Sequence, residues 1–375
     1  MPLTRRHLLS LATASALAGL TAPRLLAAPS AEAVYARSIV IDGCGGPGGR
    51  NPGEDGPLDS AEISDVGASG LAAVSMTIGN VGTMAPLEAF EQIIRDIARW
   101  EGEIDAHPDA LARIRTAGDI IAAHEAGRCG LIYALQDGVS FEDDLGRLDA
   151  LAHFGVRVIQ PTYNRRNLLG DGCMEPADAG LSRSGIEAVQ HMNELAILVD
   201  LSHCGRRTAA DAIASSNKPV AFTHTGCFAL AEHPRHRTDV ELKAVAETGG
   251  VSGIYIMPYL ARGVQPTAAD VIAHLEHAID VAGEDHVSIG TDGTISPTDL
   301  TEEYKEQFRT ITRERQERGI AAPFETEEGY LFASDLNTPR RLETLAGLLL
   351  DRGHSESRVE KLLGGNLLRV FSEAW

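Results

Sequence analysis

The chain has 375 residues, of which 43% are hydrophobic and 23% are charged, a globular balance that excludes wholesale disorder. Its 33 basic and 53 acidic residues give a formal charge of −20 without a basic stripe, which excludes a nucleic acid partner. Beyond the N-terminal region no apolar run reaches the roughly 18 residues of a membrane span, so we expect no integral membrane protein.

Residues 1–33 are predicted to form a signal peptide. The pair Arg5 and Arg6 precedes an apolar stretch, and Ala31-Glu32-Ala33 is the best small-residue cleavage site. The placement of the pair favours twin-arginine export over an ordinary secretory signal. We therefore expect an exported protein, periplasmic or extracellular, whose mature part (34–375) forms a single domain.

Eight short β-rich runs recur along the mature part, each followed by a helical pattern. Several are near-continuous apolar runs, as in parallel strands that are covered on both faces. Eight such units favour an α/β fold, a (β/α)8 TIM-type barrel, over a doubly wound sheet. The absence of a Gly-x-Gly-x-x-Gly turn after any run weakens that alternative. The expected strands are 38–41, 71–78, 129–135, 156–160, 196–201, 219–223, 249–256 and 286–290.

The segments between these strands have the spacing of amphipathic helices. In 87–100, apolar residues recur at i, i+3 and i+4. After the eighth strand we expect a charged, mostly exposed helix at 300–318. Apolar helices at 342–350 and 358–371 are then expected to close the domain.

Two histidines and an aspartate follow predicted strands, where barrel enzymes place their chemistry. His203 and His224 end consecutive strands, and Asp292 ends the eighth. Imidazole nitrogen and carboxylate oxygen suit Zn²⁺ or a similar divalent ion, and a carboxylate beside bound water can act as a general base. We interpret the three as a functional site, against the alternative of hydrogen-bonded structural residues.

Other candidates lie at the remaining strand ends and in two polar loops. The segment 163–173 is expected to line a pocket, where Asn167 and Asp171 contact substrate or shape the loop. Arg235 either forms a surface ion pair or binds a substrate carboxylate through its guanidinium fork. The remaining candidates are Cys44 and Gln136 as metal ligands, Tyr163 as a catalytic residue and Asn164 as a further substrate contact.

The five cysteines leave three possibilities open. None lies in a C-x-x-C pair, so no local zinc or redox motif is present. They are small packing residues, or two form a disulfide near the site, or Cys44 is a metal ligand.

Several ordered motifs resemble the membrane (renal-type) dipeptidases, which are amidohydrolase-like metal-dependent barrels. The resemblance covers about residues 36–375. It implies a homodimer that binds two zinc ions and hydrolyses dipeptides. It also implies that His203 and His224 hold one metal, that Arg235 binds the substrate carboxylate and that Asp292 supports the catalytic water. The motifs are D-L-S-H at 200–203, F-T-H at 222–224, H-P-R at 233–235, G-G-V at 249–251, I-G-T-D at 289–292 and G-G-N-L-L-R-V-F at 364–371.

The chain departs from this family's pattern at the ligands of the other metal. The family's D-G-H-x-D is Asp42-Gly43-Cys44-Gly45-Gly46 here, so Cys44 stands in place of a histidine. Gln136 replaces the bridging glutamate, and a neutral amide cannot hold two cations close together. Tyr163 replaces a further histidine. We therefore expect a single Zn²⁺ on His203 and His224, completed by Asp292, Gln136 or Cys44, or no metal at all.

These observations favour a hydrolase of a small peptide or amide substrate. In it, Asp292 shuttles a proton and Arg235 anchors a carboxylate. One alternative is a non-catalytic protein that binds a small molecule in the same pocket. The other is a metal-free isomerase or lyase that acts on a carboxylate compound through Asp292 and Tyr163.

Overall fold

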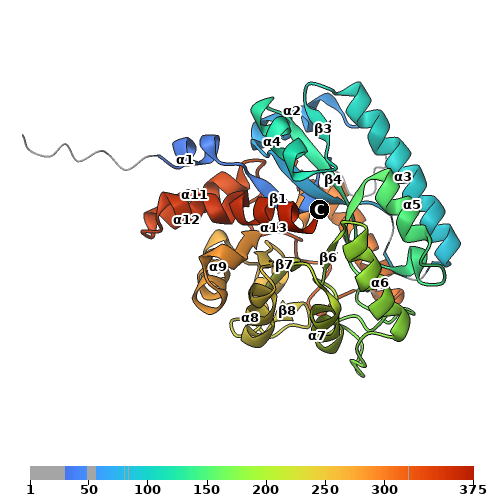
Figure 1. Ribbon diagram of the computed structural model, residues 1–375. Coiled ribbons are helices and arrows are strands. Elements are labelled where there is room, and N and C mark those ends of the chain that lie inside the picture. Colours follow the sequence, from blue (N-terminus) through green and yellow to red (C-terminus); the bar gives the residue numbers. More distant parts are fainter. Residues whose placement is uncertain (1–29, 49–55, 80, 83, 320) are drawn as a thin grey trace, which may run out of the picture.

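Eight parallel strands form a curled sheet, and helices cover it (Figure 1). The computed structural model describes residues 30–48, 56–79, 81–82, 84–319 and 321–375. The hydrogen-bonded order of the strands follows the chain, which confirms the (β/α)8 prediction. The strands are β1 (Ile41–Gly46), β2 (Ala73–Thr77), β4 (Cys129–Leu135), β5 (Val156–Ile159), β6 (Leu198–Asp200), β7 (Val220–Cys227), β9 (Val251–Ile254) and β10 (Val287–Ile289).

Three further strands were not predicted, because each lies outside the eight apolar runs and spans only two or three residues. β3 (Leu111–Arg113) pairs with β4, and β8 (His236–Arg237) pairs with β7. β11 (Gly293–Thr294) follows β10 and pairs with β1 in parallel. The continuation of the eighth strand therefore reaches the first strand and brings residues 291–294 beside β1.

The predicted position of the first strand is wrong. The run 38–41 was expected, whereas β1 spans Ile41–Gly46. Glycine is disfavoured in strands, so the three glycines of this segment hide it from a propensity argument, and pairing with β2 and β11 decides instead. As a result Cys44 lies within a strand, and it is only 5% exposed.

Most of the expected helices form, and most begin earlier than their apolar patterns. Capping boxes start several of them; Thr267 and Asp270, for example, begin α9. The single helix expected at 358–371 is wrong, because the chain kinks at Gly364 and divides this segment into separate helices. The helices that cover the strands are α2 (Ser60–Ser69), α3 (Pro86–Ala106), α4 (Ala117–Glu125), α5 (Arg147–Phe154), α6 (Arg183–Glu194), α7 (Arg206–Ser215), α8 (Asp239–Glu247), α9 (Ala268–Ala282) and α11 (Arg341–Asp351).

The N-terminal prediction falls largely outside the described residues, because the structure describes nothing before Ser30. The first described helix, α1 (Ala31–Arg37), packs on α11. Arg37 pairs with two glutamates of α12 (Glu356–Glu360).

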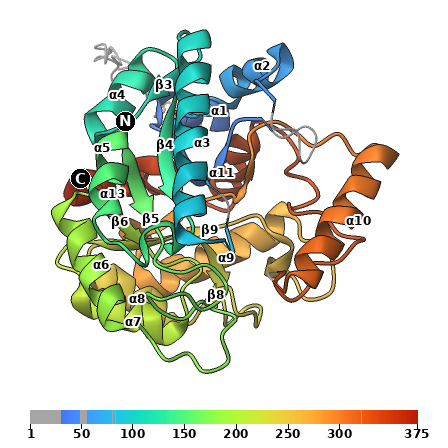
Figure 2. The ribbon, with the colours of Figure 1, turned by 90° about the vertical axis from the view of Figure 1, so that its right-hand side faces the viewer.

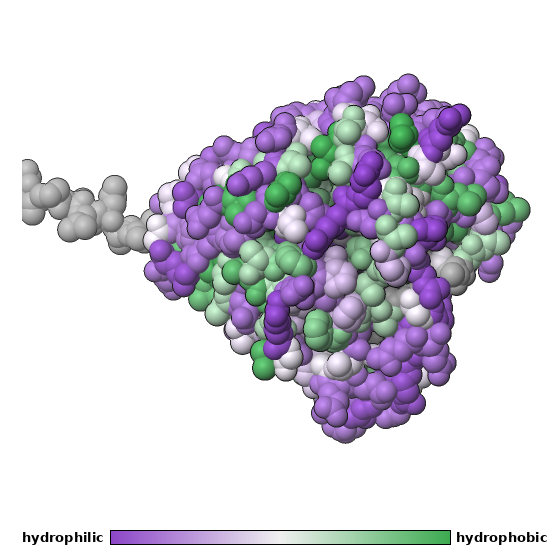
Figure 3. Space-filling model, turned by 90° about the horizontal axis from the view of Figure 1, so that it is seen from below, coloured by the Kyte–Doolittle hydropathy of each residue, from purple (hydrophilic) through white to green (hydrophobic). Residues whose placement is uncertain are grey.

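Among the described residues, no helix combines the length and the apolar character that a membrane span requires. Seen from the side of α7 and α8, hydrophilic residues cover much of the surface and apolar residues lie between them (Figure 3).

A small apolar core fills the barrel beneath the site. Ile41, Ile132 and Val158 contribute to it from three strands, and α13 (Asn366–Ala374) packs Phe371 against them. α13 and the charged helix α10 (Glu302–Glu317) lie on opposite sides of the barrel (Figure 2). One end of the barrel is therefore filled with apolar side chains, and polar side chains gather at the strands' carboxyl ends.

Two glycines allow the strands to come unusually close just below this polar end. A Cβ on Gly290 would lie 2.0 Å from the carbonyl oxygen of Thr223, and one on Gly43 would lie 2.9 Å from the same oxygen. Any side chain there would force β1, β7 and β10 apart. We call this close approach of Gly43 and Gly290 to Thr223 the glycine crossing. Cys44, His224 and Asp292 follow these contacts by one or two residues, so the glycine crossing brings the three together.

Candidate active site and metal centre

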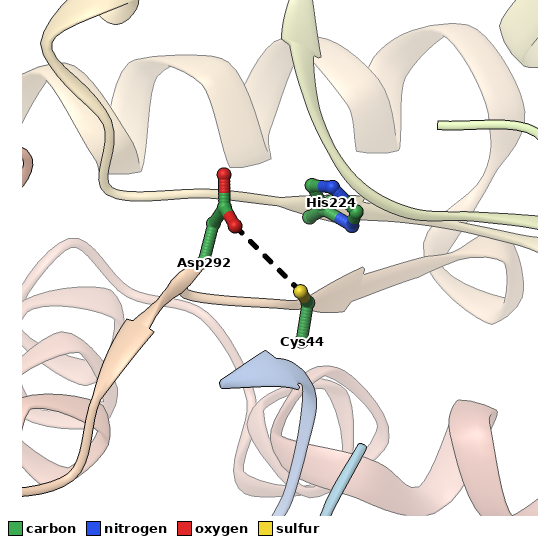
Figure 4. Close-up of side chains that lie close together, drawn as sticks. All are labelled: Cys44, His224 and Asp292. Atoms are coloured by element: carbon green, nitrogen blue, oxygen red, sulfur yellow. Dashed lines mark hydrogen bonds between the residues drawn. The ribbon is translucent and has the colours of Figure 1, made fainter. Parts of the chain in front are cut away.

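Cys44, His224 and Asp292 form a compact cluster of potential metal ligands. One ligand atom from each lies within 4.8 Å of the others. The Cys44 Sγ donates to Asp292 Oδ1 over 3.7 Å. Figure 4 shows the sulfur directed at the carboxylate, with the imidazole ring beside them. Sulfur, nitrogen and oxygen donors thus converge from β1, β7 and the segment after β10, a donor set that suits Zn²⁺.

Hydrogen bonds fix the tautomer of His224. Thr223 Oγ1 lies 2.8 Å from His224 Nδ1, and the Thr223 hydroxyl already donates its one proton to Asp200 Oδ2 over 2.6 Å. The Nδ1 of His224 must therefore donate, which leaves an unprotonated Nε2. This Nε2 is buried and has no hydrogen-bond partner. His224 thus presents a bare lone pair to the cluster.

His203 is oriented in the same way by a different residue. Its Nδ1 lies 2.7 Å from Asn164 Oδ1, a carbonyl oxygen that can only accept. Its Nε2 is also buried without a partner, and its ring centroid lies 5.1 Å from that of His224. Tyr163 stacks on its other face with ring centroids 4.1 Å apart. Burial lowers the pKa of both histidines well below the usual range, so both are neutral.

Asp292 has a backbone conformation that is rare for residues other than glycine. Its φ is 57°, and its N–H donates to the Cys44 carbonyl over 2.7 Å. Burial raises the pKa of its carboxyl to about 6, while the charge of Arg235 acts in the opposite direction. Non-glycine residues in this region cluster at functional sites, which agrees with a functional role for Asp292.

Two buried aspartates tie neighbouring strand ends together below these groups. Asp42 accepts from the N–H and hydroxyl of Thr291 at 2.8 and 2.6 Å, and also from the Cys44 N–H. Asp200 accepts in the same manner from Ser202 and Thr223. These carboxylates hold the loops that carry the candidate ligands.

Gln136 turns its amide N–H groups toward Cys44. Its Nε2 lies 3.3 Å from Cys44 Sγ and 2.9 Å from Thr77 Oγ1, and it donates to both. Asp137 points elsewhere, as the alternation of a strand predicts, and accepts from Asn167 and two backbone N–H groups. Gln136 is therefore a neighbour of the cluster that supplies no negative charge.

The described residues fit one divalent ion. Cys44, His224 and Asp292 converge on one point. The His203 ring lies next to the His224 ring, and its Nε2 is also without a hydrogen-bond partner. Two cations held side by side need a bridging carboxylate, and Gln136 offers an amide in its place. Among the described residues, one such group of converging potential ligands is found.

The remaining predicted residues shape the surroundings of the cluster. Arg235 is 2% exposed and donates to the carbonyls of Ser202 and His224, so the surface ion-pair alternative is wrong. Asn167 accepts from two N–H groups of its own loop, and Asp171 pairs with Arg166. Asn164, which was expected to contact substrate, orients His203.

All five cysteines are free, so the disulfide alternative is wrong. Cys204 and Cys227 are fully buried, and burial raises the pKa of each thiol to about 12. Cys44 is the one that lies in the ligand cluster.

A group of side chains that joins α10 to the site was not predicted from the sequence. Arg315 of α10 forms a bidentate ion pair with Glu325 at 2.8 and 3.1 Å, and it also bonds to Tyr163. The Tyr259 hydroxyl donates to the same glutamate over 2.8 Å. An exposed, charged pattern such as that of α10 does not reveal which of its arginines turns inward.

Comparison with known protein families gives a match over most of the chain. Residues 65–323 match the family described as "Membrane dipeptidase (Peptidase family M19)". Dipeptidase verJ of Clonostachys rogersoniana is 29% identical over 270 residues, which cover 72% of this chain and 61% of that protein. The chain thus aligns with less than two thirds of that relative's length. An uncharacterized protein in the pqqA 5′ region of Klebsiella pneumoniae is 25% identical over 285 residues, 73% of this chain and 93% of that protein.

Solved structures agree with this match. A Pseudomonas aeruginosa amidohydrolase is 32% identical with a TM-score of 0.80, covering 92% of this chain and 99% of that one. A metallo peptidase from Rhodobacter sphaeroides, solved with a phosphinate mimic of L-Ala-D-Ala, has a TM-score of 0.71 at 19% identity. It covers 90% of this chain and 100% of its own, and at that identity it supports the fold alone.

Proposed function

The chain belongs to the membrane dipeptidase family, and from this premise we propose that it hydrolyses the amide bond of small peptide-like substrates with one divalent metal ion. The observation that carries the proposal is the buried Nε2 of His224, which has no hydrogen-bond partner and lies in the cluster with Cys44 and Asp292, together with the equally unpartnered Nε2 of His203 on the neighbouring ring. Structural histidines in a protein interior normally use both nitrogens. Here the Nδ1 of each ring forms a hydrogen bond that orients the ring, and the Nε2 has no partner.

Cys44, His224 and Asp292 are the proposed ligands, with His203 beside them. A divalent ion there, Zn²⁺ by its donors, would polarise a scissile carbonyl and lower the pKa of a bound water. Asn164 and Thr223 fix the imidazole tautomers, which is the usual task of residues behind metal ligands. Burial of all these groups strengthens their electrostatic effect on a substrate.

The chain's own groups perform the remaining steps. We assign to Asp292 the transfer of a proton from the attacking water to the leaving amine, through a carboxylate oxygen. Arg235 is assigned to the substrate carboxylate, because its buried positive charge borders Asp292 and the loops of both histidines. Tyr163 packs on His203 and holds its ring in place.

Export through the twin-arginine pair and assembly as a homodimer complete the proposal. The support for export is the sequence of residues 1–33, and the support for a dimer is the family resemblance. The substrate class likewise follows from the family, whose description names a dipeptidase.

Metal content per chain tests the proposal most directly. Elemental analysis of protein purified without chelator is expected to give about one equivalent of metal, which His224→Ala lowers. Turnover of a panel of dipeptides and small amides is then expected with Zn²⁺, Mn²⁺ or Co²⁺. Two equivalents would contradict the single-ion site. Folded protein without metal or turnover, but with chelator-insensitive ligand binding, would indicate a non-catalytic binding protein.

A further inference from the structure

A hollow adjoins the cluster on the side of α10. It has a volume of about 220 Å³ and lies between the segment after β10, α10 and the loop around residue 331. Asp292 forms part of its wall, so the hollow begins at a residue of the proposed reaction site. Its apolar lining residues are Tyr304, Phe308, Ile311, Leu331 and Phe332.

The apolar lining explains an unusual feature of α10. The helix is strongly charged, yet it buries Tyr304, Phe308 and Thr312 at a spacing of four residues. This spacing places one face of the helix toward the hollow and leaves the charged residues outside. One face of α10 therefore forms part of the cavity wall, and its other faces are mostly exposed to solvent.

The polar groups on the wall are largely engaged with the chain itself. Asn337 accepts from the Thr298 N–H over 2.8 Å and donates to the Thr298 carbonyl over 2.9 Å. Thr294 donates to the Ser296 carbonyl, and Arg341 donates to the carbonyls of Ile295 and Thr338. A charged occupant would lose its hydration and gain few partners, whereas an apolar occupant loses nothing.

The volume distinguishes between occupants. A water molecule takes up about 30 Å³ of liquid, so the hollow has room for a group of several carbon atoms. A branched aliphatic or phenyl side chain is of that size.

We propose that this hollow, the α10 pocket, binds an apolar side chain on one of the two residues that flank the scissile amide. The inference rests on the proposed hydrolase activity, because it concerns the same site. Asp292 belongs to both the cluster and the pocket, so a substrate whose amide lies at the cluster reaches the pocket with a neighbouring side chain. The protein would then prefer bulky apolar residues over glycine or glutamate.

The test compares Gly-Gly with Leu-Gly, Gly-Leu, Glu-Gly and Gly-Glu. One leucine-containing dipeptide is expected to have a kcat/KM at least about 10-fold above that of Gly-Gly, because a single methylene group in an apolar pocket is already worth about 10- to 200-fold. Ile311→Trp fills the pocket and is expected to bring this ratio close to one. Gln307→Trp places the same side chain on an exposed position of the same helix and should leave the ratio unchanged. A wild-type ratio near one would overturn the proposal.

A second variant and a binding measurement keep the outcome decisive. Should Ile311→Trp fail to fold, Ile311→Ala enlarges the pocket and is expected to shift the preference from Leu toward Phe. If no dipeptide is hydrolysed, the proposed function fails, and calorimetric binding of N-acetylleucinamide and N-acetylglycinamide tests the pocket alone. Tighter binding of the leucine compound, lost in the pocket variants, would still support the pocket. Equal binding of the two compounds would refute it.

Discussion

Two walls of the site use their polar atoms in opposite ways. On the histidine wall (His203 and His224), one nitrogen of each ring is hydrogen-bonded to a neighbouring side chain and the other has no partner. On the thiol–amide wall (Cys44 and Gln136), the side chains bond to one another, and Cys44 also bonds to Asp292. Readiness to bind a cation is therefore set by the groups behind a ligand as much as by the ligand itself.

The largest effect is expected when the thiol–amide wall is given the donors that the family resemblance implies. The triple variant Cys44→His, Gly46→Asp, Gln136→Glu adds an imidazole and two carboxylates, which can balance the charge of a second dication. Metal content by elemental analysis is expected to rise from about one to about two equivalents per chain.

The single variant Gln136→Glu is the control for this experiment, since it adds charge without the other ligands and should stay near one equivalent. A Cβ at position 46 would meet only the flexible side chain of Met76, so the site tolerates the new aspartate. A folded triple variant that still binds one ion would show that the missing donors alone do not explain why the thiol–amide wall binds no second ion.

The next effect concerns the orientation of the histidine wall. Asn164→Ala removes the acceptor of His203 Nδ1 and frees the ring to change tautomer. Loss of such a partner typically lowers metal affinity about 10- to 100-fold, and competition with a chromogenic chelator measures the change.

Asn167→Ala is the matched control, because this asparagine lies in the same loop and bonds to Pro161 and Asp137 rather than to a histidine. Equal losses in the two variants would mean that the loop as a whole, and not the bond to His203, supports metal binding.

The smallest effect comes from a buried histidine away from the site. His274 accepts from the Cys227 N–H at Nδ1 and donates from Nε2 to the Leu260 carbonyl, so both nitrogens are used. Burial lowers its pKa to about 4, with a further contribution from His277, while the Leu260 bond and Asp270 oppose the shift.

The unfolded chain therefore binds this proton first as the pH falls from about 6.5 toward 4, and the folded state loses stability in that window. Between pH 6.5 and 5.5 the free energy of unfolding is expected to fall by about 1 kcal/mol because of His274. Urea denaturation of wild type and His274→Gln measures it as the difference between their slopes with pH. Parallel slopes would show that His274 titrates normally.

The sequence predicts the barrel well because its evidence is local. Apolar runs mark seven of the eight barrel strands closely, and the order of these runs along the chain is the order of the strands in the sheet. The first strand is misplaced because its glycines carry no such signal. His203 and His224 are identifiable because strand ends converge at one face of a barrel.

Other features depend on contacts between distant segments. Asn164 was identified as a polar residue of a loop, but its bond to His203 spans 39 positions. Arg315 reaches Glu325 and Tyr163 from a helix whose charges all look alike in sequence. The pocket beside α10 likewise requires three segments to be placed in space before it exists.

The glycine crossing below the site separates the position of a donor from its chemical identity. Because Gly43 and Gly290 bring the backbones together against Thr223, the distance between positions 44, 224 and 292 does not depend on the side chains placed there. Donors can then be exchanged one at a time on a fixed frame, and each exchange retunes the metal preference without rebuilding the barrel. Substitution of a ligand residue therefore leaves the barrel intact, whereas substitution of the glycines beneath the ligands would force the strands apart.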